Sequence, residues 1–116
     1  MQKIMLRSKI HRATVTECDL DYIGSIEIDE LLMKKTELLP YEQVQIYNIT
    51  NGERFTTYAI KGEAGSGRIS VNGAAAHKVK KGDMIIIVAY ALINEEEAFN
   101  HKPKIIVVDE NNAPIE

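Results

Sequence analysis

The chain has 116 residues and a mass of 13.0 kDa, which limits it to one domain with one core. Its net charge of −3 disfavours a general nucleic-acid-binding protein, which would carry a basic face or tail. The single cysteine, Cys18, excludes an intrachain disulfide, and the three histidines lack the spacing of a metal site, so we expect no metal.

The first third of the sequence predicts short strands and one short helix. Residues 10–16 are rich in β-branched side chains and predict a strand, one face of which carries His11, Ala13 and Val15. A second short strand is expected over 26–28. Asp29 then offers an N-cap for a short helix through residues 31–33.

The remaining two thirds predict further strands separated by tight turns. Asn51-Gly52 is a strong hairpin signal between strands expected over 44–49 and 54–60. Further strands are expected over 68–71, 84–89 and 105–108, with a helical turn over 74–77 and a short helix over 95–99. The apolar runs 84–88 and 105–108 predict strands buried on both faces. Many short strands of this kind are typical of a small β-barrel.

The chain carries no sign of a membrane or secretory segment. Residues 1–7 lack the apolar stretch of a signal peptide, and the longest apolar run, 84–93, is too short to cross a bilayer. We therefore expect a cytoplasmic protein with no membrane contact.

No conventional catalytic motif is present. Ser25 follows a glycine, as many turn serines do, and no G-x-S-x-G motif surrounds it. His11 or His77 could act as a base, but nothing in the sequence places either beside Ser25. The glycine-rich stretch 62–67 fits neither a Walker A nor a dinucleotide-binding motif. An enzyme with this sequence would have to generate its own catalyst. The alternatives are a non-catalytic β-barrel that binds a ligand or assembles with partners and, less favoured by the acidic charge, a DNA-binding barrel.

Five blocks of the sequence resemble the aspartate 1-decarboxylase family, in order and spacing, from about Met5 to about Ala98. They are Met5-Leu6-x-x-Lys9-Ile10-His11-Arg12, Tyr22-x-Gly24-Ser25-Ile26-x-Ile28-Asp29, Asn48-x-Thr50-Asn51-Gly52-x-Arg54-Phe55-x-Thr57-Tyr58-Ala59-Ile60, Ile69-Ser70-Val71-Asn72-Gly73-Ala74-Ala75-Ala76-His77 and Gly82-Asp83-x-Ile85-Ile86-Ile87. The resemblance implies a mainly β fold, a small six-stranded double-psi β-barrel with short helices. It also implies a single domain over 1–116 and a homotetramer.

The resemblance further implies that the chain is a zymogen that cleaves itself between Gly24 and Ser25 into chains 1–24 and 25–116. Ser25 Oγ would attack the Gly24 carbonyl, and Ser25 would become a covalent pyruvoyl group, with no metal and no pyridoxal phosphate. Glycine suits the upstream position because it tolerates strained backbone geometry. Thr57 is the implied helper, donating to the developing oxyanion. A maturation helper protein is a possible partner.

The implied reaction is decarboxylation of L-aspartate to β-alanine and carbon dioxide through a Schiff base, for pantothenate and coenzyme A synthesis. Tyr58 would donate the proton, since a phenol is protonated at neutral pH. Arg54 would bind a substrate carboxylate, and Lys9 and His11 would add positive charge. The remaining implied residues are Thr57, Gly73, Ala74 and Ala75 as substrate contacts, Asn72 as an orienting side chain and Tyr22 as a lining residue.

Strand alternation constrains how these residues can act together. Arg54, Thr56 and Tyr58 should share one face of their strand, and Lys9 and His11 should project together, whereas Thr57 points to the opposite face. Thr57 and Tyr58 could both serve one site if a bulge intervenes, or if the site lies between subunits.

Overall fold

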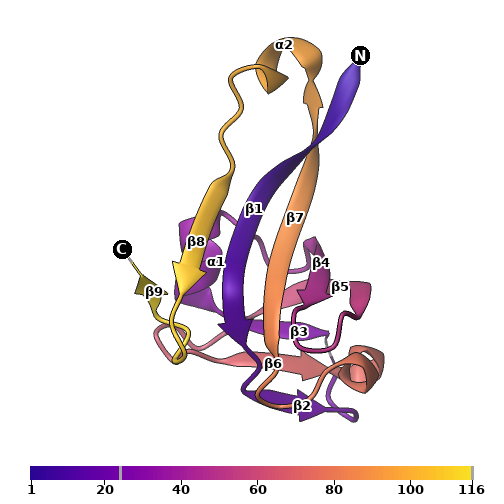
Figure 1. Cartoon of the computed structure of the whole chain (residues 1–116), viewed down its shortest axis with the longest axis vertical. Coiled ribbons are helices and arrows are strands. Elements are labelled where there is room, and N and C mark those ends of the chain that lie inside the picture. Colours follow the sequence, from indigo (N-terminus) through magenta and orange to yellow (C-terminus); the bar gives the residue numbers. More distant parts are fainter. Residues whose placement is uncertain (24, 116) are drawn as a thin grey trace.

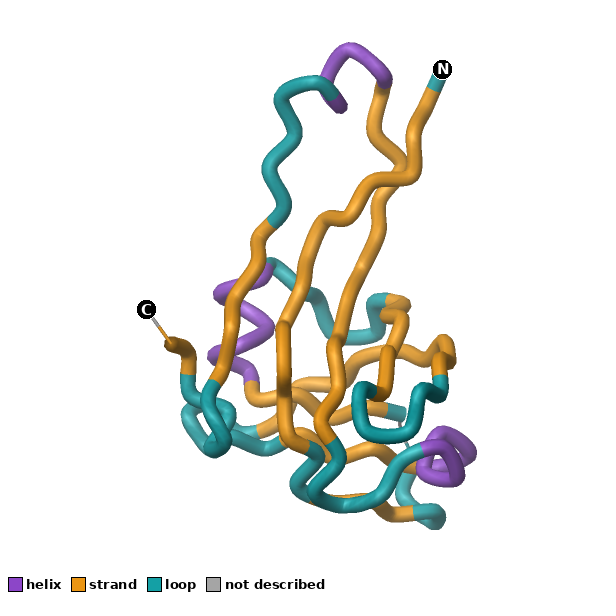
Figure 2. Tube along the Cα trace, viewed as in Figure 1, coloured by secondary structure: helices purple, strands orange, loops and turns teal. Residues whose placement is uncertain are grey.

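The computed structural model describes residues 1–23 and 25–115, which are built mainly from β-strands (Figures 1 and 2). The strands in this part of the chain are β1 (Gln2–Thr14), β2 (Glu17–Asp19), β3 (Ile26–Asp29), β4 (Gln43–Asn48), β5 (Arg54–Gly62), β6 (Ile69–Asn72), β7 (Met84–Asn94), β8 (Lys104–Val108) and β9 (Pro114–Ile115). The helices are α1 (Glu30–Thr36), the 3₁₀-helix η1 (Gly73–Lys78) and α2 (Glu95–Ala98). The predicted mainly β class with short helices is confirmed. Within the described ranges, no helix has the length and apolar character needed to cross a membrane.

Strand pairing arranges the chain as a ring. β1 pairs with β7, and the neighbours that follow around the ring are β4, β5, β3 and β6. β6 then pairs with β2, which continues β1 after only Val15 and Thr16. Thr16 N donates to Ile69 O at 2.7 Å and Ile69 N donates to Thr16 Oγ1 at 3.0 Å, so the ends of the ring are joined directly. This ring is consistent with the expected six-stranded barrel, and β8 and β9 lie outside it.

The ring encloses an aliphatic core. The side chains with no exposed surface come from every strand of the ring and from α1, and they include Ile10, Ile26, Ile28, Leu32, Ile46, Ile69, Ile85 and Ile87. Branched aliphatic side chains dominate because a small barrel has room for little else between its walls.

A two-stranded arm extends beyond the ring. It consists of the first part of β1 and the last part of β7, paired from Gln2 with Asn94 to Leu6 with Tyr90, and α2 lies at its far end (Figure 1). Its large apolar side chains are exposed: Ile4 is 73%, Leu92 is 63% and Phe99 is 85% exposed. A lone two-stranded ribbon is only marginally stable in water, so this arm lacks the packing partners that would stabilise it.

Two expectations about strand faces are wrong. The register shift between Ile10 and Ala13, where Arg12 has φ 68°, forms a bulge in β1. Ala13 therefore faces the core with Ile10, whereas His11 stays with Lys9 on the outer face beside Val107 and Ile105 of β8. β8 is also not buried on both faces, because those two β8 side chains are 39% and 49% exposed in the single chain.

The hairpin predicted at Asn51-Gly52 is present with a wider turn than a two-residue loop. Asn48 N donates to Glu53 O at 2.9 Å, and Gly52 N donates to Asn48 O at 2.8 Å, with Gly52 at φ 80°. The Asn48 amide is also held by Asp83 Oδ2 at 2.9 Å, which anchors the turn to the next strand. Consequently Tyr47 lies opposite Arg54.

Asp29 joins α1 to the glycine-rich loop between β5 and β6. Its carboxylate accepts the N-cap hydrogen bond of α1 from Leu31 N at 2.8 Å, as the sequence predicts. The same carboxylate accepts hydrogen bonds from Gly65 N at 2.9 Å and Gly67 N at 2.8 Å. Gly67 has φ 70°, and a Cβ there would lie 2.5 Å from Asn111 O, so only glycine fits this position.

Replacing Asp29 with Ala should lower the free energy of unfolding by about 2–4 kcal/mol. The change removes a helix cap, at a cost of roughly 1 kcal/mol, and leaves two loop N–H groups without their acceptor. Urea denaturation at fixed protein concentration measures this loss. The matched control is Glu63→Ala, because that exposed carboxylate makes no side-chain contact in the described residues and should change stability by less than about 0.5 kcal/mol. Equal effects of the two variants would contradict the role of Asp29.

Candidate functional site

β3 brings the predicted serine and its neighbours together. Ser25 directly precedes β3, which runs parallel to β5 and antiparallel to β6, with Ile26 paired to Ala59 and to Val71. Ser25 is half-buried, and its carbonyl oxygen accepts a hydrogen bond from Asn72 N at 2.7 Å. Gly24, the other half of the predicted cleavage bond, lies outside the described residues.

The side chain of Asn72 is buried and oriented. It is 1% exposed, and its Oδ1 accepts a hydrogen bond from Ser70 Oγ at 2.8 Å. Because Oδ1 is engaged in this way, the Nδ2 amide is the remaining donor of the side chain, and it has no hydrogen-bond partner among residues 1–23 and 25–115. An unpaired buried donor costs free energy and usually indicates a group kept for a ligand or a reaction.

Gly73 opens η1 immediately after Asn72. It has φ 63°, a left-handed conformation that disfavours other residues, and a Cβ at this position would lie 3.7 Å from Tyr22 O. The chain just before the predicted cleavage point and the start of η1 are therefore neighbours. Ala74 is exposed, whereas Ala75 packs partly against the core.

β5 presents Thr57 and Tyr58 to opposite faces. The β4–β5 register is continuous from Tyr47 opposite Arg54 to Gln43 opposite Tyr58, so no bulge intervenes. Thr57 is half-buried on the inner face, and its Oγ1 is buried with no hydrogen-bond partner in the part of the chain that the structure describes. The structure therefore excludes the bulge as the way to bring both side chains to one site.

Tyr58 lines a surface cavity that Ile23, two residues before Ser25, also lines. Tyr58 is 38% exposed, and the cavity has a volume of about 550 Å³. Its other lining residues are Ile23, Pro40, Tyr41, Ile60 and Lys61. Tyr41 has φ 72°, which is unusual for a large side chain and is the kind of backbone strain that concentrates at functional sites.

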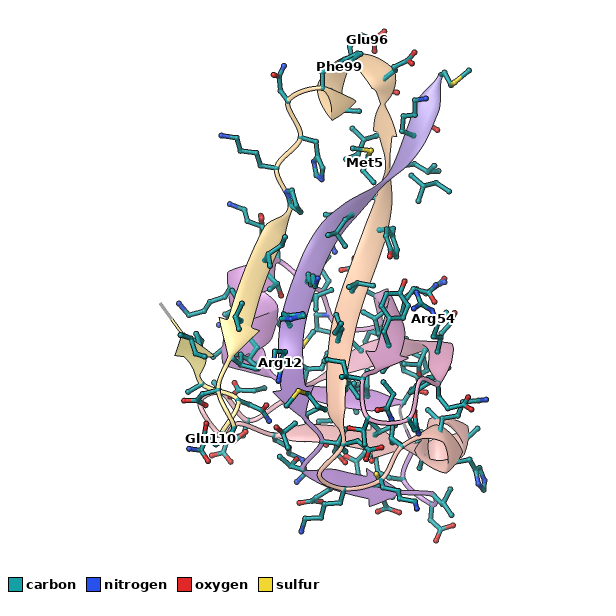
Figure 3. The ribbon with its side chains drawn as sticks, in the orientation of Figure 1. Met5, Arg12, Arg54, Glu96, Phe99 and Glu110 are labelled. Atoms are coloured by element: carbon teal, nitrogen blue, oxygen red, sulfur yellow. The ribbon has the colours of Figure 1, made fainter. Side chains whose placement is uncertain are left out.

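Arg54 projects from the start of β5, away from the ring (Figure 3). Its guanidinium carbon lies 3.7 Å from the centroid of the Tyr47 ring. This is a cation–π contact across the β4–β5 pair, and it leaves the edge of the guanidinium able to donate hydrogen bonds.

Lys9 and His11 are not brought to this group within one chain. Lys9 pairs with Val88, which pairs with Gln45, which pairs with Thr56. Three strand spacings separate Lys9 from Thr56, or roughly 14 Å. The structure thus gathers Ser25, Thr57, Tyr58, Asn72, Gly73 and Tyr22, and leaves Lys9 and His11 on another part of the outer face.

The expected positive charge of His11 is also corrected. Burial lowers the pKa of His11 below its ordinary value of 6.5, and the charges of Lys9 and Arg12 lower it further. His11 is therefore mainly neutral at pH 7, and it can serve as a hydrogen-bonding group rather than as a cation. Its Nδ1 atom is buried and has no hydrogen-bond partner within the described ranges.

The unpartnered polar atoms coincide with the predicted site. Among the described residues, the buried side-chain nitrogen and oxygen atoms without a hydrogen-bond partner are His11 Nδ1, Thr57 Oγ1 and Asn72 Nδ2. All three belong to residues that the sequence singles out. Within the described ranges, His, Cys, Asp and Glu side chains form no group of three or more that could hold a metal ion.

The sequence reasoning missed several residues that shape the site. Ser70 orients Asn72, Tyr41 lines the cavity beside Tyr58, and Tyr47 stacks on Arg54. Ser70 could have been identified from the sequence, because it lies two residues before Asn72 in the same block. The other two depend on a turn conformation and on the strand register.

These features describe a small β-barrel chain with a serine at a strand start and, on the two flanking strands, two buried polar atoms without a partner among the described residues. Comparison with known proteins assigns the class. The family model described as "Aspartate decarboxylase" matches residues 1–115, and the chain belongs to this family of enzymes.

Individual relatives agree with this assignment. The chain is 58% identical over 115 residues to the aspartate 1-decarboxylase of Thermoanaerobacter pseudethanolicus, covering 99% of this chain and 98% of the relative. It is 60% identical over 112 residues to that of Syntrophus aciditrophicus, covering 97% of each. It is 61% identical over 108 residues to that of Caldicellulosiruptor bescii, covering 93% of this chain and 84% of the relative.

The NMR titration of His11 should give a pKa below 6.5. Because the pKa of His11 is lower in the folded protein, the unfolded chain binds a proton at this residue first as the pH falls below 6.5. The free energy of unfolding should therefore decrease toward acid pH. Lys9→Met should raise the pKa of His11 but not restore it fully, because burial is the larger cause. Lys34→Met is the control, since Lys34 is not among the charges that act on His11. A His11 pKa at or above 6.5 would contradict the described environment.

Proposed function

We propose that the chain cleaves itself between Gly24 and Ser25 and then decarboxylates L-aspartate to β-alanine and carbon dioxide. The observation that carries this proposal is the pair of unpartnered donors, Thr57 Oγ1 and Asn72 Nδ2, on the two strands that flank the start of β3. Membership of the aspartate decarboxylase family supports the choice of reaction. On the same grounds we propose that the product serves pantothenate and coenzyme A synthesis in the cytoplasm.

The cleavage needs only groups of this chain and water. Ser25 Oγ attacks the Gly24 carbonyl carbon, and the acyl group moves from nitrogen to oxygen to give an ester. Loss of the Ser25 α-proton and of the ester carboxylate then leaves Gly24 as a new C-terminus and residue 25 as dehydroalanine. Hydrolysis of that residue releases ammonia and leaves a pyruvoyl group at the head of chain 25–116.

Thr57 is the proposed donor to the oxyanion that forms on the Gly24 carbonyl oxygen. Its hydroxyl is already buried and has no competing partner among the described residues, so little reorganisation is needed when negative charge develops. A preorganised donor of this kind commonly contributes about 100-fold or more to a rate.

The residues around Ser25 fit a pyruvoyl group. Its chemistry is that of a ketone that can condense with a substrate amine and accept the electrons of a departing carboxylate. Asn72 Nδ2 can donate to a carbonyl oxygen there, because Ser70 fixes the amide with its nitrogen free. The left-handed Gly73 lets the backbone approach closely, so Gly73, Ala74 and Ala75 are proposed substrate contacts.

The outward residues are proposed to handle the substrate. Arg54 binds a carboxylate through the free edge of its guanidinium. Tyr58, which lines the surface cavity that includes Ile23, donates a proton to the carbon that loses carbon dioxide. Tyr22 lines the same region from the side of Gly73.

Lys9 and His11 are proposed to act on the site of a neighbouring copy in a homotetramer. Each chain keeps them far from its own Ser25, and the face around them is apolar, with Ile105 49% and Val107 39% exposed. Assembly with neighbouring copies would also cover the exposed apolar side chains of the two-stranded arm. Whether a maturation helper protein acts on the chain is a separate prediction from the family resemblance.

Ser25→Ala should abolish both cleavage and β-alanine formation, and Thr57→Val should slow cleavage by about 100-fold or more. Intact-mass spectrometry under denaturing conditions follows the fragments of 24 and 92 residues (116 − 24), and β-alanine release measures turnover. Both effects follow from removing the nucleophile or the oxyanion donor.

Two matched variants control for general damage. Ser66→Ala removes a serine from an exposed loop, and Thr56→Val removes a hydroxyl that is bonded to Gln45 Oε1 at 2.8 Å on the opposite face from Thr57. Both should be processed at the normal rate. An intact chain under all maturation conditions, with no β-alanine formed, would favour the non-catalytic barrel instead.

Co-expression of Ser25→Ala and Lys9→Met chains should restore activity that neither variant has alone. In a mixed tetramer, the Lys9 of a Ser25→Ala copy would complete the site around the Ser25 of its Lys9→Met neighbour. Differently tagged chains, purified in tandem, allow the β-alanine assay on the mixed assembly. No recovery in mixed tetramers that contain processed Lys9→Met chains would show that Lys9 does not act across copies.

A further inference from the structure

We propose that Tyr47 is a positioning residue that holds Arg54 in the orientation needed to bind a substrate carboxylate, with Tyr90 as its anchor. The Tyr47 ring centroid lies 3.7 Å from Arg54 Cζ, and the Tyr47 and Tyr90 hydroxyls are 2.8 Å apart. The proposal rests on the proposed function of Arg54 as a carboxylate-binding residue.

Strand register brings the three side chains to the same surface. Tyr47 lies opposite Arg54 in the β4–β5 pair and opposite Ile86 in the β4–β7 pair. Tyr90 lies four residues further along β7, the strand directly paired with β4, and the two phenol hydroxyls meet at 2.8 Å. The three residues therefore form a chain of contacts, from Tyr90 through Tyr47 to Arg54, on the outside of the barrel.

Stacking on Tyr47 limits the rotamer freedom of the Arg54 side chain, which has few other contacts to restrain it. Arg54 is exposed, and in the described residues it makes no ion pair within 4.0 Å and no side-chain hydrogen bond. An unrestrained arginine samples many rotamers, and ordering it on binding costs free energy. A guanidinium held against an aromatic ring keeps its plane fixed and its N–H edge available for a bidentate contact.

Tyr90 fixes the ring itself. Its hydroxyl is within hydrogen-bond distance of the Tyr47 hydroxyl, and this bond is the largest cause of the raised pKa of Tyr90, followed by burial. The Tyr90 hydroxyl therefore stays protonated in the pH range where most enzymes work, and it remains hydrogen-bonded to Tyr47. Because the Tyr47 ring is tethered at its hydroxyl end, its face stays toward Arg54.

The experiment measures binding of succinate to the processed enzyme by titration calorimetry. Succinate has two carboxylates and no amine, so its affinity reports carboxylate recognition without any reaction. Tyr47→Leu should weaken succinate binding about 2- to 5-fold, the size expected for loss of an exposed cation–π contact. The KM for aspartate should rise by the same factor, with kcat changed much less.

Conservative variants distinguish positioning from a general structural role. Tyr47→Trp should keep near-normal affinity, since tryptophan supports a cation–π contact at least as well. Tyr90→Phe should cause a smaller loss than Tyr47→Leu, because the ring remains but loses its tether. Thr56→Val, on the same sheet face with its hydroxyl bonded to Gln45 Oε1, should bind succinate normally. Thermal unfolding of each variant verifies that it is folded.

Arg54→Ala separates this inference from the proposed function. It should weaken succinate binding at least about 10-fold, as expected for loss of a charged hydrogen-bonding group. If Arg54→Ala has this effect and Tyr47→Leu binds normally, the positioning role is wrong and the function of Arg54 stands. Failure of Tyr47→Trp to rescue affinity would likewise overturn the positioning role. If Arg54→Ala itself binds normally, Arg54 is not the carboxylate-binding residue and the inference fails with it.

Discussion

The placement of β3 between β5 and β6 is the constraint on which the rest of the site depends. Ser25 is the residue before β3, so its surroundings are set by the two neighbouring strands: Thr57 and Tyr58 come from β5, and Asn72 ends β6, directly before Gly73 at the start of η1. A slip of one residue in either pairing would exchange inward and outward side chains. The buried Ile26 and Ile28 hold this register, because neither can be turned to solvent without loss of core packing.

The chain tolerates unpaired polar groups at the site because the surrounding backbone is firmly held. The Asp29 carboxylate joins α1 to the loop that leads into β6, and Thr16 joins the end of β1 to the same strand. Ser70 leaves Asn72 with one engaged and one free polar atom. Each unpaired donor lowers the stability of the fold, and the hydrogen bonds that hold the surrounding backbone offset this cost.

The outer face of the barrel combines charged residues with exposed apolar ones. Lys9 and His11 lie beside Ile105 and Val107, and Arg54 lies against Tyr47. For a single chain this surface and the protruding arm are unfavourable. In the assembly that we propose, they become the contacts through which one copy completes the site of another, which accounts for apolar side chains and functional residues on one face.

Much of the local structure followed from the sequence, because capping, turn and alternation signals act over a few residues. Asp29 as a helix cap, the hairpin at Asn51-Gly52 and the opposite faces of Thr57 and Tyr58 could all be predicted. The bulge at Arg12, the neutral state of His11, the separation of Lys9 from Ser25 and the stacking of Tyr47 on Arg54 could not. Each of these depends on which strands become neighbours and in what register, and only the closed ring of strands decides that.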